Sequence, residues 1–260
     1  MLFRSVADTI LSQLPELKVI SKYGVGLDGL HVDALARRGI KLGWTGGVNR
    51  RSVSELTLSF AIALLHRVPE TTVKLRGHEW QKLVGRQLTG RTVGIIGCGF
   101  VGQDLVKLLA PFECRILAHD IRDYSEFYQA HKVTPVGLYQ LLAESDIVTL
   151  HVPLDKSTKG MIGEAQLSRM RAGTCLINAA RGGLVDEDAL AAALETGHLA
   201  GAACDVFQME PDANARLLAH PAFLGTPHIG GSTQEAQLAM GRAAIEGLEQ
   251  NRVPGDGWPG

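Results

Sequence analysis

The stretch "RTVGIIGCGFVG", residues 91–102, decides the fold. Its first half is a short apolar run typical of a buried strand, and its second half carries Gly97, Gly99 and Gly102 in the spacing G-x-G-x-x-G. Residues 100–112, "FVGQDLVKLLAPF", then follow the pattern of a helix. Glycines between a strand and a helix permit a tight turn and let the backbone approach a pyrophosphate. The stretch therefore predicts the opening strand, turn and helix of a dinucleotide-binding unit.

Downstream of this stretch, apolar strands alternate with helices. Strands are expected at 114–120, 146–153, 174–180 and 200–207, and helices at 137–145, 162–170 and 186–197. Near-continuous apolar strands separated by helices indicate a parallel sheet that is covered on both faces. Right-handed crossovers then give the α/β fold class, with a doubly wound parallel sheet of the Rossmann type.

The remaining segments predict a second, smaller domain. Strands are expected within 17–28 and 40–44, with a helix at 31–39 between them. Two long helices, at about 52–67 and 232–250, would connect the domains, the second starting at Ser232 or Thr233 as N-cap. The predicted division is a smaller domain of residues 1–50 and 236–260, and a dinucleotide-binding domain of residues 51–235.

Composition excludes several classes of partner. The chain has 260 residues, 45% hydrophobic residues and a formal net charge of −1, which gives no electrostatic reason to bind nucleic acid or an anionic membrane. It contains no run of 18 apolar residues, so no membrane span is expected. The four cysteines lack the spacing of metal ligands or of a disulfide framework, which favours reduced thiols and a cytoplasmic location.

Asp120 indicates the cofactor. It ends the strand that follows the glycine-rich turn and lies 18 residues after Gly102. A carboxylate there accepts hydrogen bonds from the ribose hydroxyls and repels a 2′-phosphate, which favours NAD over NADP. The nearby Arg122 argues the other way, and a bare turn with a solvent-facing aspartate is the alternative interpretation.

Polar residues follow the predicted strands at one edge of the sheet, where ligands bind in such folds. They are His151, Val152 and Pro153, then Arg181, Asp205 and His228, with Glu210 five residues after Asp205. A redox site for a 2-hydroxy acid needs a cation for the carboxylate, an acid–base group for the hydroxyl proton and an anion that orients this base. Arg181, His228 and Glu210 meet these needs in that order.

Each of these residues also has a structural explanation. His228 follows Thr-Pro and suits a turn, Glu210 precedes Pro211 and suits a loop, and Arg181 could pair with an acidic residue at the start of the next helix. Their joint placement downstream of the glycine motif favours the catalytic interpretation.

Several longer motifs are similar to those of one enzyme family. The chain resembles the D-isomer-specific 2-hydroxyacid dehydrogenases, and among them most nearly the phosphoglycerate dehydrogenases. The resemblance covers nearly the whole chain and rests on "KYGVGLD" (22–28), "NRRSVSEL" (49–56), "GIIGCGFVG" (94–102), "HVPLDKSTKGMI" (151–162), "LINAARGGLVDEDAL" (176–190), "LAGAACDVFQMEP" (199–211) and "TPHIGGSTQEA" (226–236).

The resemblance implies roles for individual residues. Arg181, Glu210 and His228 would form the catalytic set, and Asp205 would contact the nicotinamide carboxamide. Further cofactor contacts would come from Gly97, Gly99, Phe100, Val101, Gly102, Asp120, His151, Val152, Pro153, Thr158, Ala179, Ala180 and Gly230. The substrate would meet Arg181, Asn49 and the backbone amides of Val25 and Gly26. It also implies a homodimer that packs through residues 69–90, with Trp80 at or near the contact.

The chain departs from the family at its start, because "MLFRSVADTI" matches a later strand of the flavodoxin-like substrate domain. The first strand–helix units of that domain are therefore expected to be absent. In "FRS" (3–5), Arg4 is either a ligand of a substrate phosphate or a plain surface arginine. The expected reaction interconverts a D-2-hydroxy acid and its 2-keto acid. The first candidate pair is 3-phosphoglycerate and phosphohydroxypyruvate. The alternatives are a glyoxylate or hydroxypyruvate reductase, an NAD-sensing binding protein like the C-terminal-binding corepressors, and a folded NAD-binding fragment with little turnover.

Overall fold

A computed structural model of the protein describes residues 6–255, and within this range the chain forms two compact units. One unit contains residues 6–52 together with 231–255, and the other contains residues 53–230. Arg4, a candidate ligand for a substrate phosphate or else a plain surface arginine, lies outside the described residues.

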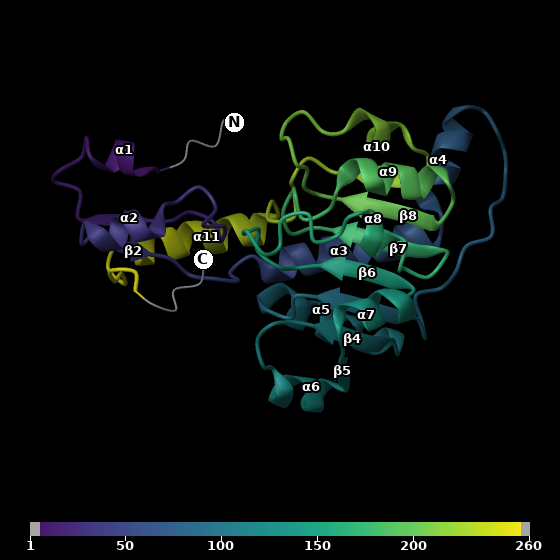
Figure 1. The fold of residues 1–260 in the computed structure, drawn as a ribbon, viewed down its shortest axis with the longest axis horizontal. Coiled ribbons are helices and arrows are strands. Elements are labelled where there is room, and N and C mark those ends of the chain that lie inside the picture. The colour runs from purple at the N-terminus through teal and green to yellow at the C-terminus, as the bar shows by residue number, and fades with distance from the viewer. Residues whose placement is uncertain (1–5, 256–260) are drawn as a thin grey trace. The chain divides into compact units, whose positions relative to one another are not determined.

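The larger unit contains a seven-stranded sheet in the order β5-β4-β3-β6-β7-β8-β9, with every neighbouring pair parallel. Its strands are β3 (Thr92–Ile96), β4 (Arg115–His119), β5 (Val133–Pro135), β6 (Ile147–Leu150), β7 (Thr174–Asn178), β8 (Leu199–Cys204) and β9 (Phe223–Gly225). The order reverses at β3, so the expected doubly wound parallel sheet is confirmed. Figure 1 shows β6, β7 and β8 side by side within this unit.

The sequence predicts no range for the two edge strands, β5 and β9, although it places His228 after a strand. Each has three residues, and β5 contains Pro135, which lacks the N–H that a central strand needs. Neither strand has the long apolar run that marks the buried strands between them.

Helices cover both faces of this sheet. One face packs on α7 (Leu138–Glu144), α8 (Glu164–Leu167) and α9 (Glu187–Glu195). The other packs on α3 (Arg50–Leu65), α5 (Phe100–Leu109) and α6 (Ser125–His131). The remaining helices of this part of the chain are α4 (Val68–Arg76), the single 3₁₀ turn η1 (Ala110–Phe112) and α10 (Ala215–Ala219).

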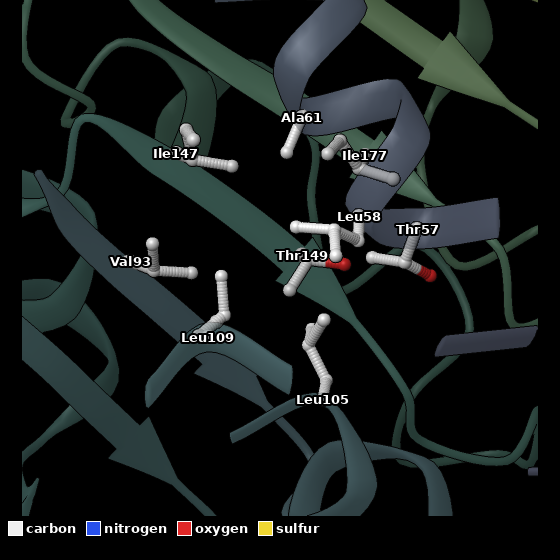
Figure 2. A pocket seen from close by; sticks show the side chains of 9 residues that line it. All are labelled: Thr57, Leu58, Ala61, Val93, Leu105, Leu109, Ile147, Thr149 and Ile177. Atoms are coloured by element: carbon white, nitrogen blue, oxygen red, sulfur yellow. The ribbon is translucent and has the colours of Figure 1, made fainter. Parts of the chain in front are cut away.

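The layer between α3, α5 and the sheet is mostly apolar (Figure 2). It includes a small pocket whose polar lining groups are the hydroxyls of Thr57 and Thr149. Both hydroxyls have partners inside the protein, the carbonyl of Val53 at 2.8 Å and Nε2 of His151 at 3.1 Å. This pocket therefore belongs to the packing of the core and offers no polar group to a ligand.

The smaller unit has a two-stranded parallel sheet of β1 (Val19–Ser21) and β2 (Lys41–Gly43). Its helices are α1 (Asp8–Leu11), α2 (Val32–Arg37) and α11 (Gln234–Glu246). Thr233 is the N-cap of α11, because its side chain accepts a hydrogen bond from the Ala236 amide. A compact core forms around Leu11, Leu35 and Leu42.

Candidate active site

The three glycines of the motif differ in what surrounds them. Gly97 has φ +92°, and a Cβ on it would lie 2.7 Å from the carbonyl carbon of His151. A Cβ on Gly102 would lie 2.4 Å from the Gly97 oxygen, whereas a Cβ on Gly99 would meet nothing within 4 Å. Gly97 and Gly102 are thus required by the protein's own packing. The space beside Gly99 at the start of the helix is open, and the contact of Gly99 with a pyrophosphate stays a prediction.

The amides at the start of α5 suit the same ligand. Gly99 is the N-cap of this helix and has no side chain to bond the first N–H groups. Phe100 and Val101 form the first turn, and Phe100 is exposed. The positive end of the helix dipole and uncapped amides together favour a bound anion.

Asp120 directly follows β4 and is held by two backbone amides. Oδ2 accepts a hydrogen bond from Cys98 N at 2.6 Å, and Oδ1 accepts one from Arg122 N at 2.8 Å. Because Cys98 lies inside the glycine-rich turn, the carboxylate is fixed beside the proposed pyrophosphate site. A carboxylate oxygen has more than one lone pair, so these bonds leave capacity for ribose hydroxyls.

His151, Val152 and Pro153 follow β6. Nε2 of His151 lies 3.1 Å from the Thr149 hydroxyl, and Nδ1 is buried without a hydrogen-bond partner. Burial lowers the pKa of His151 to about 3, so this imidazole is neutral near pH 7 and is unsuited to acid–base work there. The loop after it is closed by Thr158, whose hydroxyl donates to the Pro153 carbonyl at 2.7 Å.

Ala179, Ala180 and Arg181 follow β7. The buried Asn178 closes this turn, because its Nδ2 donates to the Arg181 carbonyl at 2.9 Å and its Oδ1 accepts from the Ala180 amide at 3.2 Å. The Arg181 side chain is part-buried, and one of its nitrogens donates to the Ala180 carbonyl at 2.7 Å. Asn178 therefore fixes the backbone turn from which the Arg181 side chain extends.

The loop of Arg181 lies directly against the segment that carries Glu210. A Cβ on Gly182 would lie 1.8 Å from the carbonyl oxygen of Phe207, so only glycine allows this approach. Two chain segments that lie about 25 residues apart are brought together in this way, and each delivers one of the expected catalytic residues.

Asp205 follows β8 and is almost completely buried. Oδ1 accepts hydrogen bonds from the Thr226 hydroxyl at 2.6 Å and the Ile229 amide at 2.8 Å, and Oδ2 accepts one from the Gly230 amide at 2.7 Å. The Asp205 carbonyl also accepts from the His228 amide at 2.8 Å. The carboxylate thus shapes the turn after β9, and its contact with a nicotinamide carboxamide stays a prediction.

Glu210 and His228 form a hydrogen-bonded pair. Nδ1 of His228 lies 2.9 Å from Oε2 of Glu210, and Oε1 of Glu210 accepts from the Phe207 amide at 3.1 Å. His228 has φ +55°, an uncommon conformation for a residue with a Cβ, and it sits in the turn that Asp205 holds. Its side chain is 42% exposed, so a small molecule can reach the imidazole.

The residues of the smaller unit that are expected to bind substrate lie in two different segments. Val25 and Gly26 lie in the loop after β1, where the Val25 carbonyl accepts from Trp44 Nε1 at 3.0 Å. Asn49 immediately precedes α3, and a Cβ on Gly231 would lie 2.8 Å from its Nδ2. Their roles toward substrate stay predictions.

Sequence reasoning missed three residues that build the site, namely Asn178, Thr226 and Glu187. Asn178 is a buried amide at the end of an apolar strand, which is an available signal because buried polar groups need partners. Thr226 and Glu187 bond to residues that are distant in sequence, Asp205 and Gln208 respectively, so no local pattern marks them.

Comparison with known proteins identifies the family. The family profile described as "D-isomer specific 2-hydroxyacid dehydrogenase, NAD binding domain" matches residues 58–230. A D-3-phosphoglycerate dehydrogenase of Bacillus subtilis is 32% identical over 252 residues, which cover 94% of this chain and 47% of that protein. A hydroxypyruvate reductase of Thermotoga maritima is 36% identical over 247 residues, which cover 93% of this chain and 79% of that protein.

Solved structures agree with this result. A glyoxylate reductase from Paecilomyes thermophila has a TM-score of 0.87 at 31% identity, covering 94% of this chain and 75% of that structure. The chain spans about half the length of the phosphoglycerate dehydrogenases that it matches. In the described residues, no helix is long and apolar enough to cross a membrane. The chain belongs to the D-isomer specific 2-hydroxyacid dehydrogenase family, and its larger unit is the NAD-binding domain of that family.

Proposed function

We propose that the protein is an NAD-dependent oxidoreductase that interconverts a D-2-hydroxy acid and its 2-keto acid. The observation that carries the proposal is the pair of His228 and Glu210, with Nδ1 and Oε2 2.9 Å apart, at the same carboxyl edge of the parallel sheet as the glycine turn after β3. An imidazole oriented by a carboxylate is a suitable acid–base group for a hydroxyl proton.

The residues of this chain divide the chemistry as follows. The nicotinamide, when bound, supplies or accepts the hydride. Glu210 holds Nδ1 of His228, which leaves Nε2 to give a proton to the carbonyl oxygen during reduction or to take it from the hydroxyl during oxidation. Glu210 also stabilises the imidazolium that forms in the oxidative direction. Arg181 pairs with the substrate carboxylate, for which a planar guanidinium is well matched.

The test is NADH oxidation with a panel of 2-keto acids by the full chain and its variants. His228→Asn should reduce kcat by about 10²–10⁴-fold, since it removes general acid–base catalysis. The matched control is His66→Asn, because His66 is exposed at the end of α3. NADH binding, followed by fluorescence, should survive His228→Asn. Activity retained by this variant with every substrate of the parent would reject His228 as the acid–base group.

Phosphohydroxypyruvate is the first candidate substrate, because phosphoglycerate dehydrogenases are among the relatives. A reductase of hydroxypyruvate or glyoxylate is the second, because relatives with those names match over a larger share of their own length. The ratio of kcat/KM values in the panel separates these candidates. No turnover with any 2-keto acid, together with tight NADH binding, would instead favour an NAD-sensing protein or an inert fragment.

Asp120 supports a preference for NAD over NADP. Its carboxylate is held by the Cys98 and Arg122 amides, so it cannot swing away from an added 2′-phosphate without losing both bonds. The expected result is a clearly higher kcat/KM with NADH than with NADPH. Equal values would show that Arg122 compensates for the carboxylate.

A homodimer is proposed from the exposed apolar side chains of α4 and the segment that follows it. In the single chain Trp80 is 82% exposed and Val84 is 90% exposed, with Val73 and Leu75 exposed on α4. Such a cluster is unusual for a surface that faces only water. Light scattering at micromolar concentration should report a dimer, and Trp80→Ser with Val84→Asp should dissociate it. Tyr139→Ser, at an exposed aromatic residue of α7, is the control. A wild-type monomer would reject the proposal.

A further inference from the structure

The first turn of α9 has three consecutive acidic residues with different partners. Asp186 is the N-cap of its own helix and accepts from the Asp188 and Ala189 amides. Glu187 and Asp188 instead reach across to the segment after β8. Oε1 of Glu187 accepts from the Gln208 amide at 2.5 Å, and Oδ1 of Asp188 accepts from Asn214 Nδ2 at 3.1 Å. Two of the three carboxylates therefore accept hydrogen bonds from the segment that contains Glu210.

Within that segment, two successive backbone amides point to two different carboxylates. The Phe207 amide donates to Oε1 of Glu210, and the Gln208 amide donates to Oε1 of Glu187. The backbone at Phe207 also lies against Gly182, where no Cβ would fit. The position of the Glu210 carboxylate therefore depends on a short stretch of backbone that Glu187 holds from one side.

Glu187 is in an unusual place for a glutamate whose role is only to support a helix. Its pKa is raised, first by burial and then by the neighbouring Asp188 and Asp186 carboxylates, whereas the bond from Gln208 lowers it. Burying a carboxylate beside like charges costs free energy, and the hydrogen bond from the Gln208 amide offsets part of this cost. An exposed side chain would support the dipole of α9 equally well.

We propose that Glu187 is a positioning residue that holds the turn from Phe207 to Glu210 and so fixes the Glu210 carboxylate against His228. This inference rests on the proposed function of Glu210 and His228. The carboxylate bonded to His228 is that of Glu210, and Glu187 acts on it through the Gln208 amide.

The chemistry of the bond separates this role from support of the helix. A glutamine retains the acceptor oxygen and the length of the side chain but has no charge. An aspartate retains the charge at the helix N-terminus but is one methylene shorter, so it cannot reach the Gln208 amide. If Glu187 is a positioning residue, Glu187→Gln should keep the turn from Phe207 to Glu210 in place and Glu187→Asp should not. If Glu187 only supports the helix dipole, the reverse is expected.

The experiment compares Glu187→Ala, Glu187→Asp and Glu187→Gln in the full chain. The control is Glu164→Ala, since Glu164 is an exposed acidic residue at the first position of α8. The first readout is amide hydrogen exchange of residues 206–210 without cofactor or substrate. Exchange should become about tenfold faster in the alanine and aspartate variants, as expected when a backbone donor loses its partner. The glutamine variant and the control should match the parent.

The second readout is kinetic, with the best keto acid of the panel. The alanine and aspartate variants should lose about tenfold in kcat, with the NADH dissociation constant within about twofold of the parent. The glutamine variant should recover most of the loss. Unchanged exchange in Glu187→Ala, or recovery by aspartate in place of glutamine, would overturn the proposal. If the parent has no turnover, the proposed function fails, and the exchange readout still decides whether Glu187 holds the turn.

Discussion

Two buried aspartates lie at opposite ends of the parallel strands, Asp146 at the amino end and Asp205 at the carboxyl end, and they have different kinds of hydrogen-bond and ion-pair partners. Asp205, after β8, accepts hydrogen bonds from one hydroxyl and two backbone amides. Asp146, just before β6, accepts from the Thr92 amide at 3.0 Å and lies within 4.0 Å of three arginines. Neutral donors surround the carboxylate at the carboxyl end of the strands, and cations surround the one at the other end.

The difference indicates that the structural ion pairs lie at the amino ends of the strands, away from the candidate catalytic residues at the carboxyl ends. Arg86 and Arg91, before β3, and Arg171, before β7, tie Asp146 to two separate segments, so this cluster connects parts of the chain. At the other end a structural cation beside Asp205 would compete with Arg181 for an anionic substrate. Backbone amides shape the turn of His228 without adding a charge to the site.

Removal of the Asp146 carboxylate is expected to have the largest effect on stability. Asp146→Asn removes the charge that faces three partly exposed arginines. It weakens one charged hydrogen bond, from Arg171, which contributes about 1.5–3 kcal/mol, and two longer ion pairs, which contribute up to about 1 kcal/mol each. Urea unfolding should show this loss, while kcat per folded molecule stays unchanged. Glu195→Gln, which breaks the exposed pair with Arg216, is the control and should change little. A reduced kcat in folded Asp146→Asn would contradict the separation of the two ends.

Asp205→Asn should show the opposite pattern. An asparagine has one acceptor oxygen and an NH₂ group, so at least one of the three donors loses its partner, at a cost of about 1–3 kcal/mol. The loss of stability is therefore smaller than for Asp146→Asn. The loss of kcat is larger, on the order of tenfold or more, because the turn of His228 loosens.

A cofactor analogue decides between the two roles of Asp205. If Asp205 mainly contacts the carboxamide, its substitution should matter less with 3-acetylpyridine adenine dinucleotide, which lacks the amide NH₂. If it mainly shapes the turn, the defect in kcat should be the same with both cofactors.

His151 extends the comparison to pH. Its folded pKa is about 3, against about 6.5 when unfolded, so only the unfolded state gains a proton between these values. Its contribution to stability is complete above pH 6.5 and is lost as the pH falls, by at most ~1.4 kcal/mol per pH unit. Urea unfolding at pH 7 and pH 5 should therefore show a smaller decline for His151→Gln than for the parent. The control is His131→Gln, at an exposed position at the end of α6. An equal decline in His151→Gln and the parent would show that His151 is not buried as a neutral group.

The smallest expected effect comes from Thr226→Val. This change removes one of three hydrogen bonds to Asp205 and keeps the shape of the side chain, so the cost is about 0.5–1.5 kcal/mol. The kcat should fall only a few-fold, since the Ile229 and Gly230 amides still hold the turn. A loss as large as that of Asp205→Asn would mean that the hydroxyl carries most of the interaction.

The sequence by itself determined the larger unit and its cofactor motif. Apolar strands alternate with helices at a regular spacing, and Gly97, Gly99, Gly102 and Asp120 fall within one strand–turn–helix–strand stretch. These signals are local, because burial on both faces and a tight turn each restrict the residues at the position itself. The edge strands β5 and β9 escaped because a three-residue strand at an edge carries no comparable pattern.

Only the tertiary structure decided how the catalytic candidates are held. Glu210 and His228 lie 18 residues apart in the chain, and Asp205 and Glu187 reach their partners across 25 and 21 residues. A carboxylate can bond any amide or imidazole that the fold brings near it, so residue type and spacing do not identify the partner. The sequence therefore placed Asp205 correctly at the carboxyl edge of the sheet. Its hydrogen bonds to the turn of His228 depend on the pairing of β8 with β9, which only the tertiary structure shows.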